Sequence, residues 1–414
     1  MTRDFRLKAR GIFWTVLAAL VLALAPVTRA ERPDAPSFAL PGPYAVGVRD
    51  FVLDDDPTRP LEATIWYPAL ADGEPRVEYP IFGVGQALAD AVPDTAGAPY
   101  PLIVFSHGFG GTRHQSTFFT EHLASHGFVV MAVDHPGTSL AAIGTGRQSG
   151  LGNLLDLGTL TDTIFTDFAL RPLDVIRQLD AAARLRAPGG ALEGLIDVER
   201  AAVTGHSFGG YTAVAAGGAR LDFRALRDWC DANLLGPDRP LLVCLFRTAE
   251  PTVARARGLE LEPQALFPPT TDSRLKAVVA LAPWNGPIFG ETGLAGLTVP
   301  TMIIVGSADR LTPPWRDANA IYEGISSETR ALITLEYAGH LVFVGPCPSE
   351  AGDDPAFARS CIDPVWDMQR AHDLINHFAT AFFLATLNAD ADAAQALTGG
   401  AATFTGVTVR VERP

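Results

Sequence analysis

The sequence has little positive charge. Its 414 residues include 32 Lys and Arg against 46 Asp and Glu, so the formal net charge is −14. A chain of this kind offers no basic surface for phosphate backbones or anionic lipids, which argues against nucleic-acid binding. A hydrophobic content of 48% beside 19% charged residues also excludes a disordered or collagen-like polymer. The composition therefore predicts a globular protein with a large core.

The N-terminal apolar run is too short to span a membrane. Residues 11–25 form this run, which is shorter than the roughly 20 residues that a spanning helix needs. Four basic residues precede it, and the sequence Val27-Thr28-Arg29-Ala30 follows. This layout predicts a signal peptide over residues 1–30, cleaved after Ala30, and a secreted or periplasmic protein. An uncleaved membrane anchor is the alternative interpretation.

Cysteines are few, and none is spaced as a metal ligand. The chain has no Cys-x-x-Cys and no His at ligand spacing from a Cys, so a zinc site or a thiol nucleophile is the weaker idea. We expect structural disulfides in an exported protein, although four cysteines allow three pairings. Nearest-neighbour pairing would close two loops of about 15 residues each. The pairs would be Cys230 with Cys244 and Cys347 with Cys361.

The pattern of apolar runs predicts an α/β fold. Short continuous apolar runs alternate with helical or loop segments, as in parallel strands covered on both faces. These runs lie at residues 101–105, 128–133, 201–204, 275–281, 300–305 and 331–336. Two β-rich stretches at 44–49 and 61–67 predict an antiparallel edge. We expect a mostly parallel sheet of about eight strands with helices on both faces.

Segments outside this alternation predict the domain organisation. We expect a catalytic domain over residues 31–388, with a cap inserted at about 217–271 because that connection is too long for a plain loop. An amphipathic segment from Asp363-Pro364 predicts a closing helix. A C-terminal tail, 389–414, ends in a strand-like pattern for which the sequence identifies no partner.

The most informative motif follows the apolar run at 201–204. Residues 205–210 read Gly-His-Ser-Phe-Gly-Gly and precede a helix-compatible run at 211–216. A G-x-S-x-G motif between a strand and a helix is typical of a nucleophile elbow, where glycines permit a tight turn and the serine hydroxyl is exposed. We predict that Ser207 is a nucleophile.

A serine nucleophile needs a base and a third group that orients the base. In α/β hydrolases the acid and then the histidine follow the serine along the chain, each after a strand. Asp309 follows the apolar run at 300–305, and His340 follows the run at 331–336. We predict that Asp309 orients His340 and that His340 serves as general base and then general acid. A helix cap and a turn are the plain structural interpretations of these two residues.

Backbone amides are the predicted stabilisers of negative charge on the substrate oxygen. One is the N–H of Phe208, directly after the nucleophile. The other is the N–H of Phe109 in the glycine-rich loop at 106–111, for which a simple turn is the alternative. We expect His107 and His206 to brace these loops. A metal site built from His107, His114, Asp134 and His135 lacks any recognised ligand spacing, so we expect no metal and no cofactor.

These motifs resemble the platelet-activating-factor acetylhydrolase and dienelactone-hydrolase-like group of α/β hydrolases. The resemblance covers about residues 44–387 and rests on Phe105-Ser-His-Gly-Phe-Gly-Gly, Ala132-Val-Asp-His and Gly205-His-Ser-Phe-Gly-Gly. It implies oxyanion donors at Phe109 and Phe208. Plasma acetylhydrolases carry the triad acid in a Leu-Asp-Ala-Trp segment, whereas this chain reads Leu281-Ala-Pro-Trp, so the role falls to Asp309.

The downstream half is also similar to bacterial cutinases and polyester hydrolases. This similarity rests on Ala282-Pro-Trp, on residues 299–309 and on Gly339-His340. It implies that Trp284 lines the substrate cleft, and a buried core position is the alternative.

The sequence as a whole predicts a secreted serine esterase that acts through an acyl-enzyme. Phe109, Phe208, Trp284 and Leu341 would give its pocket apolar walls, which favour acyl chains or aromatic esters. The expected substrate is a small-molecule or lipid ester, including short-acyl lipids such as platelet-activating-factor-type phospholipids. Amide or peptide cleavage by the same triad, and a non-catalytic binding protein with a hydrolase fold, are the alternatives. The oligomeric state stays open.

Overall fold

The computed structural model describes residues 34–71, 75–142, 157–235, 240–260, 266–345 and 362–412. The predicted signal peptide, residues 1–30, lies outside these ranges, as do Cys347 and Cys361. Among the described residues, no helix combines the length and the apolar character needed to cross a membrane.

Six parallel strands form the centre of the sheet, in the order β6-β5-β7-β8-β9-β10. Every residue of β5, β6 and β9 is buried, as expected for strands covered on both faces. All six coincide with the apolar runs from which the sequence analysis predicted strands. Their bounds are β5 (Tyr100–Ser106), β6 (Val129–Val133), β7 (Ile196–His206), β8 (Leu275–Leu281), β9 (Thr301–Gly306) and β10 (Arg330–Leu335).

Five further strands extend this centre on both sides. The predicted strands β1 (Ala45–Leu53) and β2 (Leu61–Ala69) pair antiparallel, and β2 continues antiparallel onto β6. The hairpin of β3 (Arg76–Tyr79) and β4 (Gly83–Ala89) was not predicted, because both strands are short and carry mostly exposed or half-buried residues. At the opposite edge, β11 (Val407–Glu412) pairs antiparallel with β10 and gives the C-terminal strand pattern its partner. The described sheet therefore has eleven strands rather than eight.

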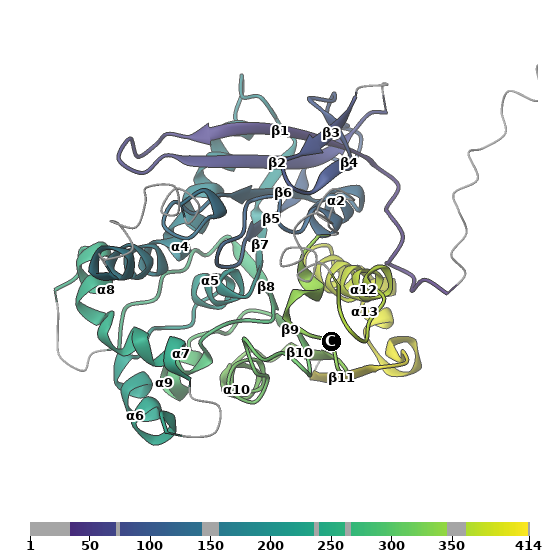
Figure 1. Cartoon of the computed structure of the whole chain (residues 1–414). Coiled ribbons are helices and arrows are strands. Elements are labelled where there is room, and N and C mark those ends of the chain that lie inside the picture. Colours follow the sequence, from purple (N-terminus) through teal and green to yellow (C-terminus); the bar gives the residue numbers. More distant parts are fainter. Residues whose placement is uncertain are drawn as a thin grey trace, which may run out of the picture. The chain divides into compact units, whose positions relative to one another are not determined.

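Helices cover both faces of the sheet (Figure 1). One face carries α4 (Leu157–Arg186), α5 (Phe208–Ala216) and α10 (Ala318–Gly324), and the other carries α2 (Thr117–Ser125) and α12 (Met368–Leu387). This arrangement confirms the predicted α/β class. Short helices complete the connections: α9 (Gly290–Leu294), α13 (Ala391–Ala396), η4 (Gly286–Ile288), η5 (His340–Phe343) and η8 (Gly399–Ala402).

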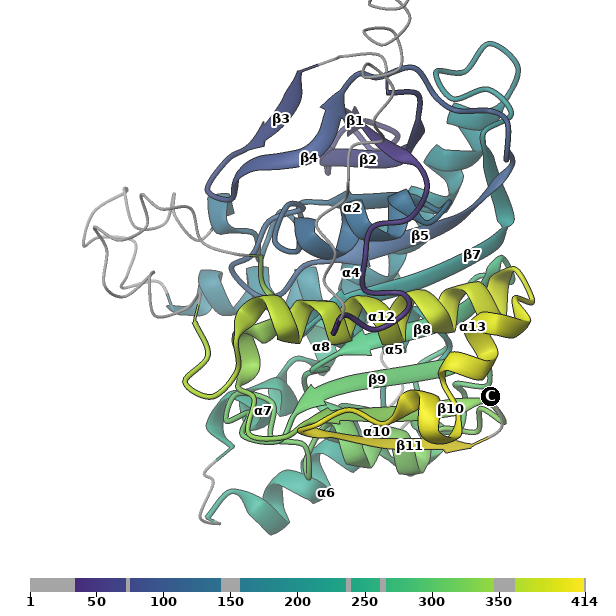
Figure 2. The same ribbon diagram turned by 90° about the vertical axis from the view of Figure 1, so that its right-hand side faces the viewer.

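The closing helix begins later than the sequence indicated. Asp367, not Asp363, caps α12, because its side chain accepts the N–H of Arg370. Asp363 instead accepts the N–H groups of Val365 and Trp366 in a preceding turn. Figure 2 shows α12 lying across β8, with α13 packed beside it.

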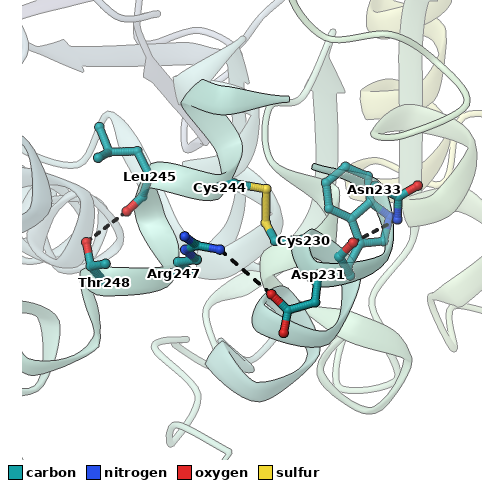
Figure 3. Close-up of a disulfide and its surroundings, with 8 residues drawn as sticks. Cys230, Asp231, Asn233, Cys244, Leu245, Arg247 and Thr248 are labelled. Carbon is teal, nitrogen blue, oxygen red and sulfur yellow. Dashed lines mark hydrogen bonds and ion pairs between the residues drawn. A yellow bond between two sulfur atoms is a disulfide. The ribbon is translucent and has the colours of Figure 1, made fainter. Parts of the chain in front are cut away.

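Small helices occupy the described part of the predicted cap, residues 217–271. They are α6 (Phe223–Asn233), α7 (Leu241–Leu245), η3 (Phe246–Thr248) and α8 (Glu250–Ala256). The disulfide between Cys230 and Cys244 joins α6 to α7 (Figure 3). This bond confirms one of the two predicted pairs.

Candidate active site

Ser207 lies at a strained turn between β7 and α5. Its φ of 59° places a non-glycine residue in the left-handed region, a conformation that surrounding contacts must impose. Its N–H donates to the carbonyl of Leu281 over 2.9 Å, and its own carbonyl accepts the N–H of Trp284 over 3.0 Å. The end of β8 and the residues after it therefore hold the backbone of Ser207 from both sides.

The glycines of the motif are required by close backbone contacts. A Cβ added to Gly209 would lie 1.8 Å from the carbonyl oxygen of Ser106, and one added to Gly205 would lie 2.5 Å from the same oxygen. No side chain fits at either position unless β5 and α5 move apart. The G-x-S-x-G pattern thus reflects the tight approach of α5 to the end of β5.

Asp309 and His340 meet at the carboxyl ends of two neighbouring parallel strands. Asp309 follows β9 and His340 follows β10, and the Oδ2 of Asp309 lies 2.6 Å from the Nδ1 of His340. The other oxygen of Asp309 accepts the N–H groups of Leu311 and Thr312, over 2.9 and 2.8 Å. The carboxylate is therefore fixed by its own loop and faces the imidazole.

The electrostatics of Asp309 favour its ionised form. Burial alone would raise the pKa of its carboxyl, but the hydrogen bond and the charge of His340, together with donors from Thr312, lower the pKa below its ordinary value. An ionised Asp309 accepts the Nδ1–H of His340. The Nε2 of that ring is then the nitrogen able to accept a proton.

Ser207 and His340 border one cavity of about 450 Å³. The predicted residues Phe109, Phe208, Trp284 and Leu341 also line it, whereas Asp309 lies behind His340 and does not. Among the described residues, no Lys, Arg, Asp or Glu borders this cavity. Much of its wall comes from apolar side chains that the sequence did not identify: Ile81, Phe82, Leu140, Ile164, Phe165, Leu242, Leu245, Phe246, Leu311 and Val344.

Three aromatic rings pack together beside Ser207, those of Phe208, Phe246 and Trp284. The ring of Trp284 lies 5.1 Å from that of Phe208 and 4.8 Å from that of Phe246, both in edge-on geometry. Phe246 comes from the segment predicted as a cap. That segment therefore contributes directly to the wall of the cavity.

The loop after β5 presents one amide that has no partner among the described residues. The carbonyl of Gly108 lies 2.7 Å from the Nδ1 of His107 and accepts the N–H of Gly111 over 3.1 Å. Because a trans peptide directs its C=O and N–H to opposite sides, the N–H of Phe109 points away from these two donors. Within the part of the chain that the structure describes, the N–H groups of Phe109 and Phe208 have no acceptor.

Buried histidines brace the loops around the cavity, as the sequence analysis expected. His107 Nδ1 lies against the Gly108 carbonyl, so this nitrogen carries the proton, and Nε2 accepts the N–H of His135 over 3.0 Å. Burial, followed by the charge of Arg171, lowers the pKa of His107 well below its usual value. His107 is therefore a neutral ring with one donor and one acceptor in use.

Gln115 is a site residue that the sequence did not identify. Its side-chain oxygen accepts the N–H of Gly108 over 2.9 Å, and its nitrogen lies 2.9 Å from the Nδ1 of His206. The glutamine thus links the loop after β5 to the residue that precedes Ser207. No local sequence pattern signals this contact, because it joins residues 91 positions apart.

The residues of the alternative metal site are engaged in separate hydrogen bonds. His135 contacts the Oδ2 of Asp174 and the hydroxyl of Ser106, each over 2.9 Å. His114 lies 2.9 Å from the hydroxyl of Thr64, and Asp134 forms an ion pair with Arg113. In the described ranges, no group of three or more His, Cys, Asp or Glu side chains is arranged to hold a metal ion.

Comparison with known proteins identifies the family. Residues 103–354, more than half of the chain, match the profile of the alpha/beta hydrolase family. The chain belongs to the alpha/beta hydrolase family. This match confirms the family and the fold class that the motifs predicted.

Two kinds of curated relative resemble this hydrolase. Platelet-activating factor acetylhydrolase from Cavia porcellus is 32% identical over 142 residues, which is 30% of this chain and 33% of that protein. Cutinase est1 from Thermobifida alba is 25% identical over 244 residues, or 58% of this chain and 53% of the cutinase. The matches therefore span about a third and about half of these relatives, and they confirm both resemblances.

A solved structure has the same fold as this hydrolase. A ferulic acid esterase from Streptomyces cinnamoneus aligns with a TM-score of 0.56 at 21% sequence identity. The alignment covers 91% of this chain and 98% of the esterase. At this level of identity the likeness establishes the fold alone.

Proposed function

We propose that this alpha/beta hydrolase is a serine carboxylic ester hydrolase, of EC 3.1.1 type, that works through an acyl-enzyme. The observation that carries the proposal is the contact of 2.6 Å between Asp309 and His340 beside a strained Ser207 in one cavity. A nucleophile, a base and an orienting carboxylate in this chain order support acyl transfer.

The proposed reaction has two halves. The Oγ of Ser207 bonds to the ester carbonyl carbon while His340 takes the hydroxyl proton, and His340 then gives this proton to the departing alcohol. Water next attacks the acyl-enzyme, again losing its proton to His340, which returns it to Ser207 as the acid is released. The amides of Phe109 and Phe208 would stabilise the oxyanion in both halves.

The cavity wall supports an uncharged, apolar acyl or aryl group as the bound part of the substrate. Its described lining holds aromatic and aliphatic side chains and no Lys, Arg, Asp or Glu that would recognise a charged group. An acetylhydrolase and a cutinase among the similar proteins favour an ester over an amide. Short-acyl lipids such as platelet-activating-factor-type phospholipids are one substrate class within this proposal.

Export from the cytoplasm is part of the proposal. The basic and apolar layout of residues 1–30 supports a signal peptide, and the Cys230–Cys244 disulfide suits an oxidising compartment. N-terminal sequencing of protein recovered from the medium or periplasm should then begin at Glu31. Recovery of the intact N-terminus in the cytoplasm would contradict this part.

A substrate panel tests the proposed activity. Nitrophenyl esters with acyl groups from acetyl to dodecanoyl are compared with nitroanilides of the same acids, using Ser207→Ala as the background. We expect ester turnover that depends on Ser207, and a higher KM for the longer esters in Trp284→Ala, because Trp284 lines the cavity. Turnover of the amides alone, or equal ester turnover by Ser207→Ala, would refute the proposal.

A further inference from the structure

Arg171 is a fully buried cation that touches neither solvent nor the cavity. It lies within α4 with a side chain that is 0% exposed, and it is absent from the cavity lining. A buried guanidinium is costly unless its donors are satisfied, so its partners indicate why it is there. Those partners are the parts of the chain that carry Phe109 and Phe208.

The first contact is with the loop that carries Phe109. One terminal nitrogen of Arg171 donates to the carbonyl of His107 over 2.6 Å. This carbonyl and the N–H of Gly108 belong to one peptide unit, and Gln115 accepts that N–H over 2.9 Å. Arg171 and Gln115 therefore hold opposite sides of a single peptide plane, which directly precedes the peptide that carries the Phe109 amide.

The second contact is with Phe208. The guanidinium carbon of Arg171 lies 4.5 Å from the centroid of the Phe208 ring, within the range of a cation–π interaction. Phe208 begins α5, and its backbone N–H is the other proposed oxyanion donor. One side chain thus contacts the loop that carries Phe109, through the His107 carbonyl, and the ring of Phe208.

We propose that Arg171 is a positioning residue that sets the spacing of the two oxyanion donors, the N–H groups of Phe109 and Phe208. This inference rests on the proposed serine hydrolase function. Arg171 does not contact the substrate. Its guanidinium fork can reach the His107 carbonyl, the Thr138 hydroxyl and the Phe208 ring at once, which neither lysine nor methionine can do.

Neighbouring carboxylates help to keep Arg171 protonated. Burial lowers its pKa to about 10, and Asp167 counteracts part of this effect. Arg59 donates to Asp167 over 2.8 Å and to Asp174 over 2.7 Å, and Arg177 lies 3.5 Å from Asp174, so two aspartates face three arginines in this cluster. Arg59 makes no described contact with the Phe109 loop, although it shares the Asp167 carboxylate with Arg171.

A transition-state analogue separates positioning from folding. A trifluoromethyl ketone with an apolar tail adds the Ser207 oxygen to its carbonyl and places the resulting oxyanion between the two amides. The variants are Arg171→Met and Arg171→Lys, with Arg59→Met as a control that disturbs the same cluster. Ester kcat, KM and ketone affinity are measured for each, together with thermal unfolding.

For Arg171→Met we expect kcat and ketone affinity to fall together by about 10²-fold. A misplaced donor weakens the binding of the oxyanion and leaves the binding of the uncharged ester unchanged. KM should change little. The kcat and ketone affinity of Arg171→Lys should lie between those of wild type and Arg171→Met. Arg59→Met should lose thermal stability yet keep the wild-type ketone affinity. If Arg171→Met does not fold, Arg171→Lys decides by the same criterion.

Two results would overturn the inference. One is unchanged ketone affinity in the folded Arg171 variants, and the other is an equal loss in Arg59→Met. Either leaves the proposed function intact, because the wild-type enzyme would still bind the ketone and turn over esters. A wild-type protein that neither binds the ketone nor depends on Ser207 would instead refute the proposed function itself, and the inference with it.

Discussion

His206 donates its Nε2–H to the backbone carbonyl of His340 over 3.0 Å. Its other ring nitrogen lies 2.9 Å from the amide nitrogen of Gln115 and therefore accepts a hydrogen bond. Burial, and then the charge of His340, lower the pKa of His206 well below its usual value, so the ring stays neutral. His206, the residue just before Ser207 in the G-x-S-x-G motif, thus anchors the backbone of His340, the proposed base, to the end of β7.

Replacing the carboxylate of Asp309 tests its orienting role. Asp309→Asn should lower ester kcat by about 10⁴-fold, because an amide cannot hold the Nδ1–H tautomer of His340 as the carboxylate does. The control is Asp197→Asn, which changes a carboxylate paired with Arg200 at the far end of β7 and should keep the wild-type rate. Equal rates for Asp309→Asn and wild type would remove Asp309 from the site.

The lowered pKa of Asp309 predicts a pH dependence of stability. The folded-state pKa lies below the ordinary value of 3.8, so below about pH 4 the unfolded chain binds more protons than the native one. The stabilisation that Asp309 contributes is therefore present above this range and is lost as the pH falls through the folded pKa. Urea denaturation of wild type and Asp309→Asn should give free energies that differ more at about pH 5 than at about pH 3. A difference that is constant or grows toward acid pH would contradict the assignment.

A glycine substitution tests the tight turn. Gly209→Ala places a methyl group 1.8 Å from the Ser106 carbonyl oxygen, so we expect a lower unfolding temperature and loss of activity. Gly400→Ala is the matched control, because no atom of the described residues lies within 4 Å of the added carbon and its φ is not positive. Thermal unfolding followed by circular dichroism compares the two. Similar unfolding temperatures would mean that α5 does not approach β5 as closely as described.

The disulfide predicts a redox dependence of stability. Cys230 and Cys244 are 14 residues apart, and closing a loop of this size is worth about 3 kcal/mol in the chain-entropy model. The double variant Cys230→Ser/Cys244→Ser should therefore unfold at lower urea concentration than wild type. Dithiothreitol should shift wild type toward the variant and leave the variant unchanged. No shift in either comparison would argue against a stabilising bond in solution.

The parts of the fold that follow from local pattern were predictable. The eight predicted strands are continuous apolar or alternating runs, and Ser207, Asp309 and His340 each follow one of them. Because the carboxyl ends of parallel strands meet at one edge, the chain order predicted that these three residues lie at the same edge of the sheet. Ser207 and His340 border one cavity there, and Asp309 contacts His340. Signals of this kind are encoded within about ten residues, which is why a single sequence carries them.

The parts that depend on distant contacts were not predictable. Gln115 and Arg171 act through hydrogen bonds to residues far along the chain, and nothing near them in the sequence marks those partners. The start of α12 was misplaced because Asp363 followed by Pro364 is a typical helix start. In the structure Asp363 stabilises a preceding turn instead, and Asp367 caps the helix. Such choices are settled by tertiary packing rather than by local propensity.

Covalent labelling of the nucleophile tests the central claim most directly. A fluorophosphonate probe is incubated with the wild-type protein, and the modified peptide is identified by mass spectrometry. The account predicts one label per chain, on Ser207, with ester turnover lost in proportion to labelling and no label on Ser207→Ala. Full ester turnover after complete labelling, or a label on another residue that accounts for the lost activity, would contradict it.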